Sequence, residues 1–125
     1  AGIRVRDMGR IDALTYASHA DDALTDTELE LVLIRSRSLN AARGLTGVLI
    51  KTDHRILQYL EGAPAALQRT FAAIERSPLH HDVQLLASAQ DVQRQFDRWH
   101  MGFHEFQLRH ERSEATQAWL DALPA

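Results

Sequence analysis

The sequence predicts an α+β domain whose elements follow the ferredoxin-like order β-α-β-β-α-β-β. Two observations carry this prediction. Apolar residues alternate with period two in five short segments, and two longer segments repeat apolar residues three and four positions apart. Such a chain is expected to form a sandwich: a five-stranded mixed sheet with two main helices on one face, followed by a short C-terminal helix.

The first strand is expected from Arg10 to Ser18, with Leu14 and Tyr16 on the same face. The first helix begins after Thr25, because Thr25-Asp26-Thr27-Glu28 is a capping box, and it ends at Gly44. Its inward face carries residues spaced three or four apart, namely Leu29, Val32, Leu33, Ser36 and Asn40.

Leu45–Lys51 and Ile56–Glu61 are predicted to form a hairpin, because both alternate and the short polar stretch 52–55 joins them. A second helix is expected from Pro64 to the Ser77-Pro78 stop. Its apolar face consists of Leu67, Phe71 and Ile74.

The last elements are predicted from weaker patterns. Val83–Ala87 and Trp99–Phe103 alternate as strands, and Ser113–Leu123 is expected to form the short C-terminal helix, anchored by Trp119. The predicted organisation is an N-terminal extension over residues 1–9, one domain over residues 10–104, and a C-terminal helical extension over residues 105–125.

Composition limits the classes of function. The 125 residues suffice for one core, so an effector activity is expected elsewhere. The net charge of −3 and the scattered arginines argue against nucleic-acid binding. The absence of cysteine suits the cytoplasm and excludes disulfides, and no apolar run approaches the roughly 20 residues of a membrane span.

Three polar residues break the apolar pattern. Gln58 lies between Ile56 and Leu60 on one face of a strand, where an unpaired buried amide would cost about 1–3 kcal/mol. Tyr16 and Asn40 are also expected on inward faces. Each residue alone is more often structural, as a core aromatic, a backbone cap or an amide bonded to a neighbour. Their convergence in one slot between the helices favours a ligand.

Other chemistry has little support. His80 and His81 are adjacent, so in a strand they point to opposite faces, and His100 and His104 would lie about 13 Å apart. This geometry disfavours a metal site, and none is predicted. No nucleophile elbow, P-loop, dinucleotide-binding glycine pattern or zinc-protease motif occurs, so no catalytic residue is assigned.

Together, four motifs resemble those of the BLUF domains, which bind a flavin and respond to blue light. The resemblance spans about residues 10–103. Its motifs are Leu14-Thr15-Tyr16-Ala17-Ser18, Asn40 with Gly44-Leu45-Thr46-Gly47-Val48-Leu49, Leu57-Gln58-Tyr59-Leu60-Glu61-Gly62, and Phe96 to Gly102 with Trp99 and Met101.

The resemblance implies that FAD, or else FMN or riboflavin, lies between the two helices. Asn40 would bind the pyrimidine edge of the ring, with Gln58 bridging the flavin to the Tyr16 hydroxyl. Light would drive an electron and a proton from Tyr16 to the flavin, and Gln58 would end rearranged. The set of expected flavin contacts is Asn40, Gln58, Ser36, Val32 and His80, and the expected output residues are Trp99 and Met101 on the last strand.

The chain departs from the family pattern at two places. Leu39 stands where many members have Asn or His, and Ser77-Pro78-Leu79-His80 keeps only the histidine of an Asp-x-Arg-His pattern. The leading hypothesis is a photoreceptor that acts on a separate protein partner or through a homo-oligomer. A homo-oligomer is expected if the outer face of the sheet is apolar and the C-terminal helix does not cover it. The alternatives are a non-photochemical ferredoxin-like binding or assembly module, and a small hydrolase using histidines of the 80–110 region.

Overall fold

The structure is a computed structural model, and it describes residues 9–97 and 101–105. The elements follow the predicted order. They are β1 (Asp12–Ala20), α1 (Asp26–Arg43), β2 (Thr46–Lys51), β3 (Arg55–Gly62), α2 (Pro64–Glu75), β4 (His80–Ala89) and β5 (Gly102–Glu105).

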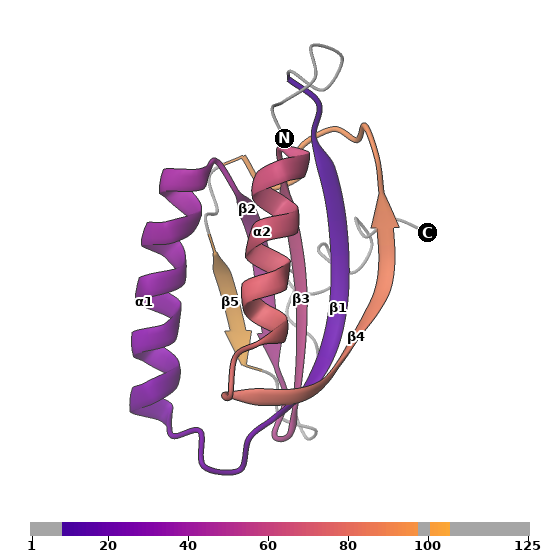
Figure 1. The fold of residues 1–125 in the computed structure, drawn as a ribbon. Coiled ribbons are helices and arrows are strands. Elements are labelled where there is room, and N and C mark those ends of the chain that lie inside the picture. The colour runs from indigo at the N-terminus through magenta and orange to yellow at the C-terminus, as the bar shows by residue number, and fades with distance from the viewer. Residues whose placement is uncertain (1–8, 98–100, 106–125) are drawn as a thin grey trace.

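One sheet organises the domain, with the strand order β4-β1-β3-β2-β5. The first four strands in this order pair antiparallel, and the short β5 pairs parallel with β2 at one edge. Figure 1 shows both helices on the same face, with α2 in front of the central strands and α1 nearer the β5 edge. The predicted α+β class and the placement of both helices are therefore confirmed.

Local sequence signals set the ends of α1. The Thr25 hydroxyl accepts a hydrogen bond from the Glu28 amide at 3.1 Å, which satisfies one of the free N–H groups of the first turn. At the other end Gly44 adopts φ 69°, and its N–H bonds back to the last turn. Glycine reaches this left-handed conformation without the steric penalty of a Cβ. Both predicted ends of α1 are confirmed.

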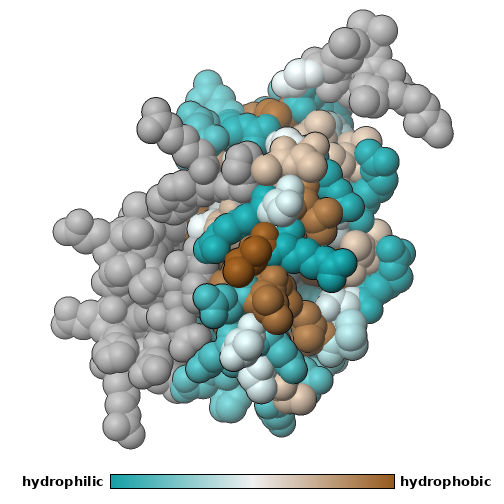
Figure 2. Space-filling view, turned by 90° about the vertical axis from the view of Figure 1, so that its left-hand side faces the viewer, coloured by the Kyte–Doolittle hydropathy of each residue, from teal (hydrophilic) through white to brown (hydrophobic). Residues whose placement is uncertain are grey.

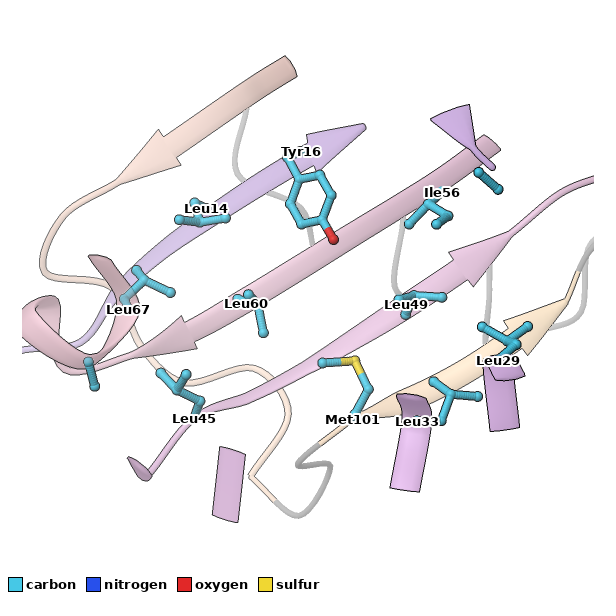
Figure 3. Packing of buried hydrophobic residues seen from close by; sticks show 12 residues of the cluster. Leu14, Tyr16, Leu29, Leu33, Leu45, Leu49, Ile56, Leu60, Leu67 and Met101 are labelled. Atoms are coloured by element: carbon cyan, nitrogen blue, oxygen red, sulfur yellow. The ribbon is translucent and has the colours of Figure 1, made fainter. Parts of the chain in front are cut away.

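The main core lies between the sheet and the helices. Leu14 and Tyr16 of β1, Leu60 of β3, Leu33 of α1 and Leu67 of α2 are among its buried members. Figure 3 shows the Tyr16 ring reaching from β1 over β3, with Met101, which directly precedes β5, joining the same cluster. The buried side chains of the helices and of the sheet thus form one layer, as the helical and strand periodicities of the sequence predicted.

A second, smaller core covers the opposite face of the sheet. Ala13, Val48, Ile50 and Tyr59 are buried there. Residues 91–96, which we call the covering segment, contribute Val92 and Phe96 to this cluster. The covering segment therefore packs on the outer face over these central strands.

The exposed large apolar side chains lie elsewhere. Leu31 and Ile34 protrude from α1, and Leu85 and Leu86 from the edge strand β4. The α1 side of the molecule, seen in Figure 2, is mainly hydrophilic with a small hydrophobic group in its middle. Within the described residues, no helix is long and apolar enough to cross a membrane.

Several predicted boundaries were wrong. β1 begins at Asp12 and continues to Ala20, because residues 19 and 20 still pair with β4. β5 begins at Gly102, so Met101 lies at a bend directly before the strand and not within it. β4 is longer than the predicted Val83–Ala87 segment. The predicted N-terminal extension, apart from Gly9, and the C-terminal helix with Trp119 lie outside the described residues, as does Trp99.

Candidate functional site

A cavity of about 440 Å³ opens between α1 and α2 above the sheet. This volume lies within the range of about 300–1,000 Å³ that is usual for small-molecule sites. Its walls are largely apolar. Its lining contains all six of the residues predicted for photochemistry or cofactor binding: Tyr16, Val32, Ser36, Asn40, Gln58 and His80.

Gln58 links the first strand to the segment before β5. The Tyr16 hydroxyl donates to Gln58 Oε1, and Gln58 Nε2 lies 3.3 Å from the Met101 sulfur, which accepts a weak hydrogen bond. All three side chains are buried, with Gln58 only 5% exposed. The buried amide therefore has a partner at each end. Reversing the amide would turn its donor end toward Tyr16 and its acceptor end toward Met101.

The Tyr16 ring is fixed on two sides. It tilts against Phe71 of α2 at a centroid distance of 5.7 Å and meets the edge of His80 at 6.0 Å. Burial raises the pKa of the Tyr16 hydroxyl well above its ordinary value, because the phenolate would lose its hydration. In the resting protein the proton therefore stays on Tyr16, in its bond to Gln58.

His80 joins three elements beside the cavity. Its Nε2 donates to the Ile74 carbonyl at 2.7 Å, because a carbonyl can only accept, and Nδ1 of a neutral ring then accepts from the Ser18 hydroxyl at 2.7 Å. Ser18 is 1% exposed. This pair resembles the start of a hydrolytic triad, but a carbonyl takes the place of the orienting acid. Its geometry favours a structural role at the cavity wall.

The α1 helix presents the remaining predicted contacts. Val32, Ser36 and Asn40 share the face toward the cavity, and Asn40 is 3% exposed. Two cationic side chains, Arg35 and Arg43, line the same cavity, and Arg43 donates to the Thr70 hydroxyl of α2 at 3.1 Å. The α1 wall therefore combines apolar surface with an amide, a hydroxyl and positive charge.

Both departures from the family pattern fall in this site. Leu39 and Leu79 line the cavity with aliphatic side chains. Leu39 is 44% exposed, which places it at the rim.

Met101 is the predicted output residue that the structure describes. Its sulfur meets Gln58, and its backbone carbonyl accepts from Arg37 Nε of α1 at 2.9 Å. In the described part of the chain, no group of three or more His, Cys, Asp or Glu side chains is placed to hold a metal ion. The adjacent histidines do point apart: His80 faces the cavity, whereas His81 stacks on His19 at 5.7 Å.

Glu61 is a buried polar group for which the sequence predicted no role in a site. It is fully buried on the outer face of β3, and its carboxylate accepts bonds from two hydroxyls and from the backbone amides of Gln95 and Phe96. The alternation of β3 places Glu61 and Tyr59 together on that face. Two polar side chains on one strand face were the only sequence signal.

The site can hold a flat, partly polar ring. Its apolar walls suit an aromatic system. The amides of Asn40 and Gln58 each offer one donor end and one acceptor end, which suits a heterocycle edge that alternates carbonyl and N–H groups. Arg35 and Arg43 suit a phosphate-bearing tail. The residues present thus fit a flavin nucleotide.

A comparison with known protein families identifies the domain. The model of the BLUF family, described as sensors of blue-light using FAD, matches residues 11–102. These residues include β1 through β4 and Met101. No curated protein matches this chain.

Several solved structures share the fold. A bacterial light-regulated adenylyl cyclase superposes with a TM-score of 0.76 at 23% identity, over 86% of this chain and 31% of the cyclase chain. BlrB, a BLUF protein in its dark state, gives 0.74 at 25% identity, over 77% of this chain and 73% of BlrB. Klebsiella pneumoniae BlrP1 with FMN and cyclic diGMP gives 0.71 at 28% identity, over 76% of this chain and 26% of BlrP1. This chain therefore spans less than a third of the cyclase and of BlrP1.

Proposed function

The chain belongs to the BLUF family, the sensors of blue light using FAD, and from this premise we propose that it is a photoreceptor that holds a flavin between α1 and α2. The observation that carries the proposal is the buried row Tyr16–Gln58–Met101 beside the cavity. A stabilising core would need no amide there, because an aliphatic side chain fills the same space without polar groups to satisfy.

The flavin would be held by contacts that the cavity lining supplies. Asn40 and Gln58 would bind the polar edge of the ring, while Val32, Ser36 and His80 would form its walls. Arg35 and Arg43 favour a phosphate-bearing flavin over riboflavin, because cations bind phosphate oxygens strongly. FAD is the form expected for the family, and FMN, which is bound in the BlrP1 structure, is the alternative.

The bound flavin would supply light absorption and redox chemistry, as is usual for cofactor proteins. The chain supplies the hydrogen bonds. Tyr16 is proposed to give up an electron and its hydroxyl proton after excitation and to recover both, leaving Gln58 rearranged. Gln58 suits this role because its side chain has a donor and an acceptor end, so one rearrangement reverses the pattern that Tyr16 and Met101 meet.

The signal is proposed to leave through the segment before β5. A rearranged Gln58 would no longer offer Nε2 to the Met101 sulfur, and this change would bias the position of Met101. Trp99, the other expected output residue, lies outside the described residues. The receiver is proposed to be a separate protein or a second copy of this chain. The exposed apolar residues of α1 and β4 are candidate contact surfaces. The cytoplasmic location stays a prediction.

The test is the visible absorption spectrum of the purified protein, reconstituted with FAD where needed, before and after blue illumination. We expect a flavin band that shifts slightly to the red and recovers in the dark. Gln58→Leu should bind flavin and lose the shift, whereas Leu57→Val, a change on the opposite face of β3, should keep it. A protein that binds no flavin, or binds it without any shift, would instead indicate a ferredoxin-like binding module.

A further inference from the structure

The outer face of the sheet carries a second polar cluster, separate from the cavity. Its centre is Glu61 of β3, which is fully buried. The Thr46 hydroxyl donates to Glu61 Oε1 at 3.0 Å, and the Tyr59 hydroxyl donates to Oε2 at 2.9 Å. A buried carboxylate is retained only when it is well hydrogen-bonded, because desolvating its charge is costly.

The other donors to Glu61 come from the covering segment, more than 30 positions further along the chain. The Gln95 amide lies 2.8 Å from both carboxylate oxygens, and the Phe96 amide lies 2.7 Å from Oε1. Hydrogen bonds from backbone amides to a carboxylate are charge-assisted and stronger than neutral ones. Glu61 therefore fixes the backbone of the covering segment, and not merely a side chain.

Neighbouring contacts fasten the same segment. Arg94 donates to the Thr46 hydroxyl at 2.7 Å and to the Gly44 carbonyl at 3.1 Å. The Phe96 ring meets the Tyr59 ring edge-on at 5.6 Å. The amides of Asp91 and Val92 bond to residues 12 and 11. The segment is thus attached along its length to the outer face of the sheet.

The attachment ends shortly before the residue that meets Gln58. Met101 follows Phe96 by five positions, a distance of at most about 18 Å along an extended chain. Gln58 and Glu61 lie on the same strand, β3, with their side chains on opposite faces of the sheet. Glu61 binds the covering segment on one face, and Gln58 binds Met101 on the other. A change at Gln58 therefore acts directly on Met101, while Glu61 holds Gln95 and Phe96 on the other face.

We infer that Glu61 is a positioning residue that anchors the covering segment, sets where Met101 meets Gln58, and holds Gln95 and Phe96 in place when Gln58 rearranges. The inference rests on the proposed function for its light-dependent part. Its structural part, the anchoring of Gln95 and Phe96 and the placement of Met101, holds in the dark.

The experiment uses the whole chain loaded with FAD and compares Glu61→Gln with wild type. Glutamine retains one acceptor oxygen but turns an amide toward groups that were donating, so the four donors can no longer all be satisfied. We expect hydrogen exchange at the Gln95 and Phe96 amides to accelerate by about tenfold or more. Glu30→Gln, which removes an exposed carboxylate on α1, should leave this exchange unchanged.

The position of Met101 is monitored by its methyl resonance in protein labelled with ¹³C-methyl methionine. The chain has only two methionines, so the spectrum is simple to assign. In Glu61→Gln we expect the Met101 signal to move or broaden while the thermal unfolding transition remains cooperative. Under illumination, amide exchange in wild type should change at Met101 and not at Gln95 or Phe96, whereas in Glu61→Gln the change should extend to both. If in Glu61→Gln both amides exchange as slowly as in wild type and the Met101 signal is the same as in wild type, the inference is wrong.

Two other outcomes, a variant that does not fold and a wild type without a red shift, are distinguished as follows. If Glu61→Gln does not fold, Arg94→Met, which removes the bonds to Thr46 and Gly44, should shift exchange and the Met101 signal in the same direction by a smaller amount. No effect in Arg94→Met would then overturn the inference. If wild type shows no red shift, the proposed function fails, and the dark measurements still decide whether Glu61 is the anchor.

Discussion

Thr15 has a buried side chain that makes no hydrogen bond within the described part of the chain. It lies on the outer face of β1, opposite Tyr59, and is 3% exposed. Thr15→Val removes a hydroxyl whose burial is uncompensated, so we expect the free energy of unfolding to stay the same or to rise by up to about 1 kcal/mol. Urea denaturation measures this change.

Thr46→Val provides the matched comparison. The Thr46 hydroxyl donates to Glu61 and accepts from Arg94, so its removal leaves both partners short of a bond. We expect a loss of about 1–3 kcal/mol. If both variants lose the same amount, the difference in hydrogen bonding between the two hydroxyls does not control stability here.

The residues of the cavity could be found from the sequence because they violate a periodic pattern. Tyr16, Asn40 and Gln58 are polar at positions where a strand or helix face points inward, and the structure places all three at the cavity. Glu61 could not be interpreted in the same way. Two of its donors are backbone amides from a distant segment, and a backbone amide has no sequence signature. Only the folded chain brings them together.

At the scale of elements, the pairing of β2 with β3 depends on Gly47. A Cβ at this position would lie 2.0 Å from the Tyr59 carbonyl oxygen, which belongs to the backbone of the central strand and cannot turn aside. We therefore expect Gly47→Ala to lower the free energy of unfolding by 3 kcal/mol or more, at the upper end of the roughly 1–3 kcal/mol typical of overpacking. Chemical denaturation, or loss of soluble protein, reports the effect.

Gly44→Ala separates this clash from backbone strain. Gly44 has φ 69° and no atom within 4 Å of a built Cβ. The substitution should cost only about 1–2 kcal/mol, the penalty of a left-handed conformation for an L-residue. An equal or larger loss at Gly44 than at Gly47 would contradict the importance of the strand contact.

The elements with strong local signals were predicted well, and those defined by distant contacts were not. Capping by Thr25 and Gly44 determines α1 from within the segment. In contrast, the alternation of Trp99, Met101 and Phe103 suggested that Met101 lies within a strand. In the structure Met101 bonds to Arg37 and Gln58 at a bend, and β5 starts only at Gly102. Such tertiary contacts override a short alternating pattern.

For the whole molecule, the order of elements was sufficient to predict that two helices share one face of the sheet with a slot between them. That arrangement follows from short, right-handed connections. The cover of the other face was not predicted, because the covering segment is an irregular polar connector with no periodicity. The sequence therefore indicated the ligand side of the sheet and left the opposite side open.

Both tyrosines of the chain are buried, and this gives the stability of the molecule a defined dependence on pH. Burial raises the pKa of Tyr16 and of Tyr59, and the nearby Glu61 carboxylate raises that of Tyr59 further. Below pH 10 folded and unfolded chains hold these protons equally. Above the ordinary pKa of about 10, the unfolded chain loses two protons that the folded chain keeps.

The free energy of unfolding should therefore fall by about 2.7 kcal/mol per pH unit above pH 10 from these two groups, since each proton contributes about 1.36 kcal/mol. Tyrosinate absorbance in the ultraviolet should appear together with unfolding and not before it. Tyr59→Phe should halve the slope, since Tyr16 then titrates alone. Tyrosinate that forms near pH 10 while the protein is still folded would mean that solvent reaches at least one hydroxyl, and in Tyr59→Phe it would mean that water enters the cavity at Tyr16.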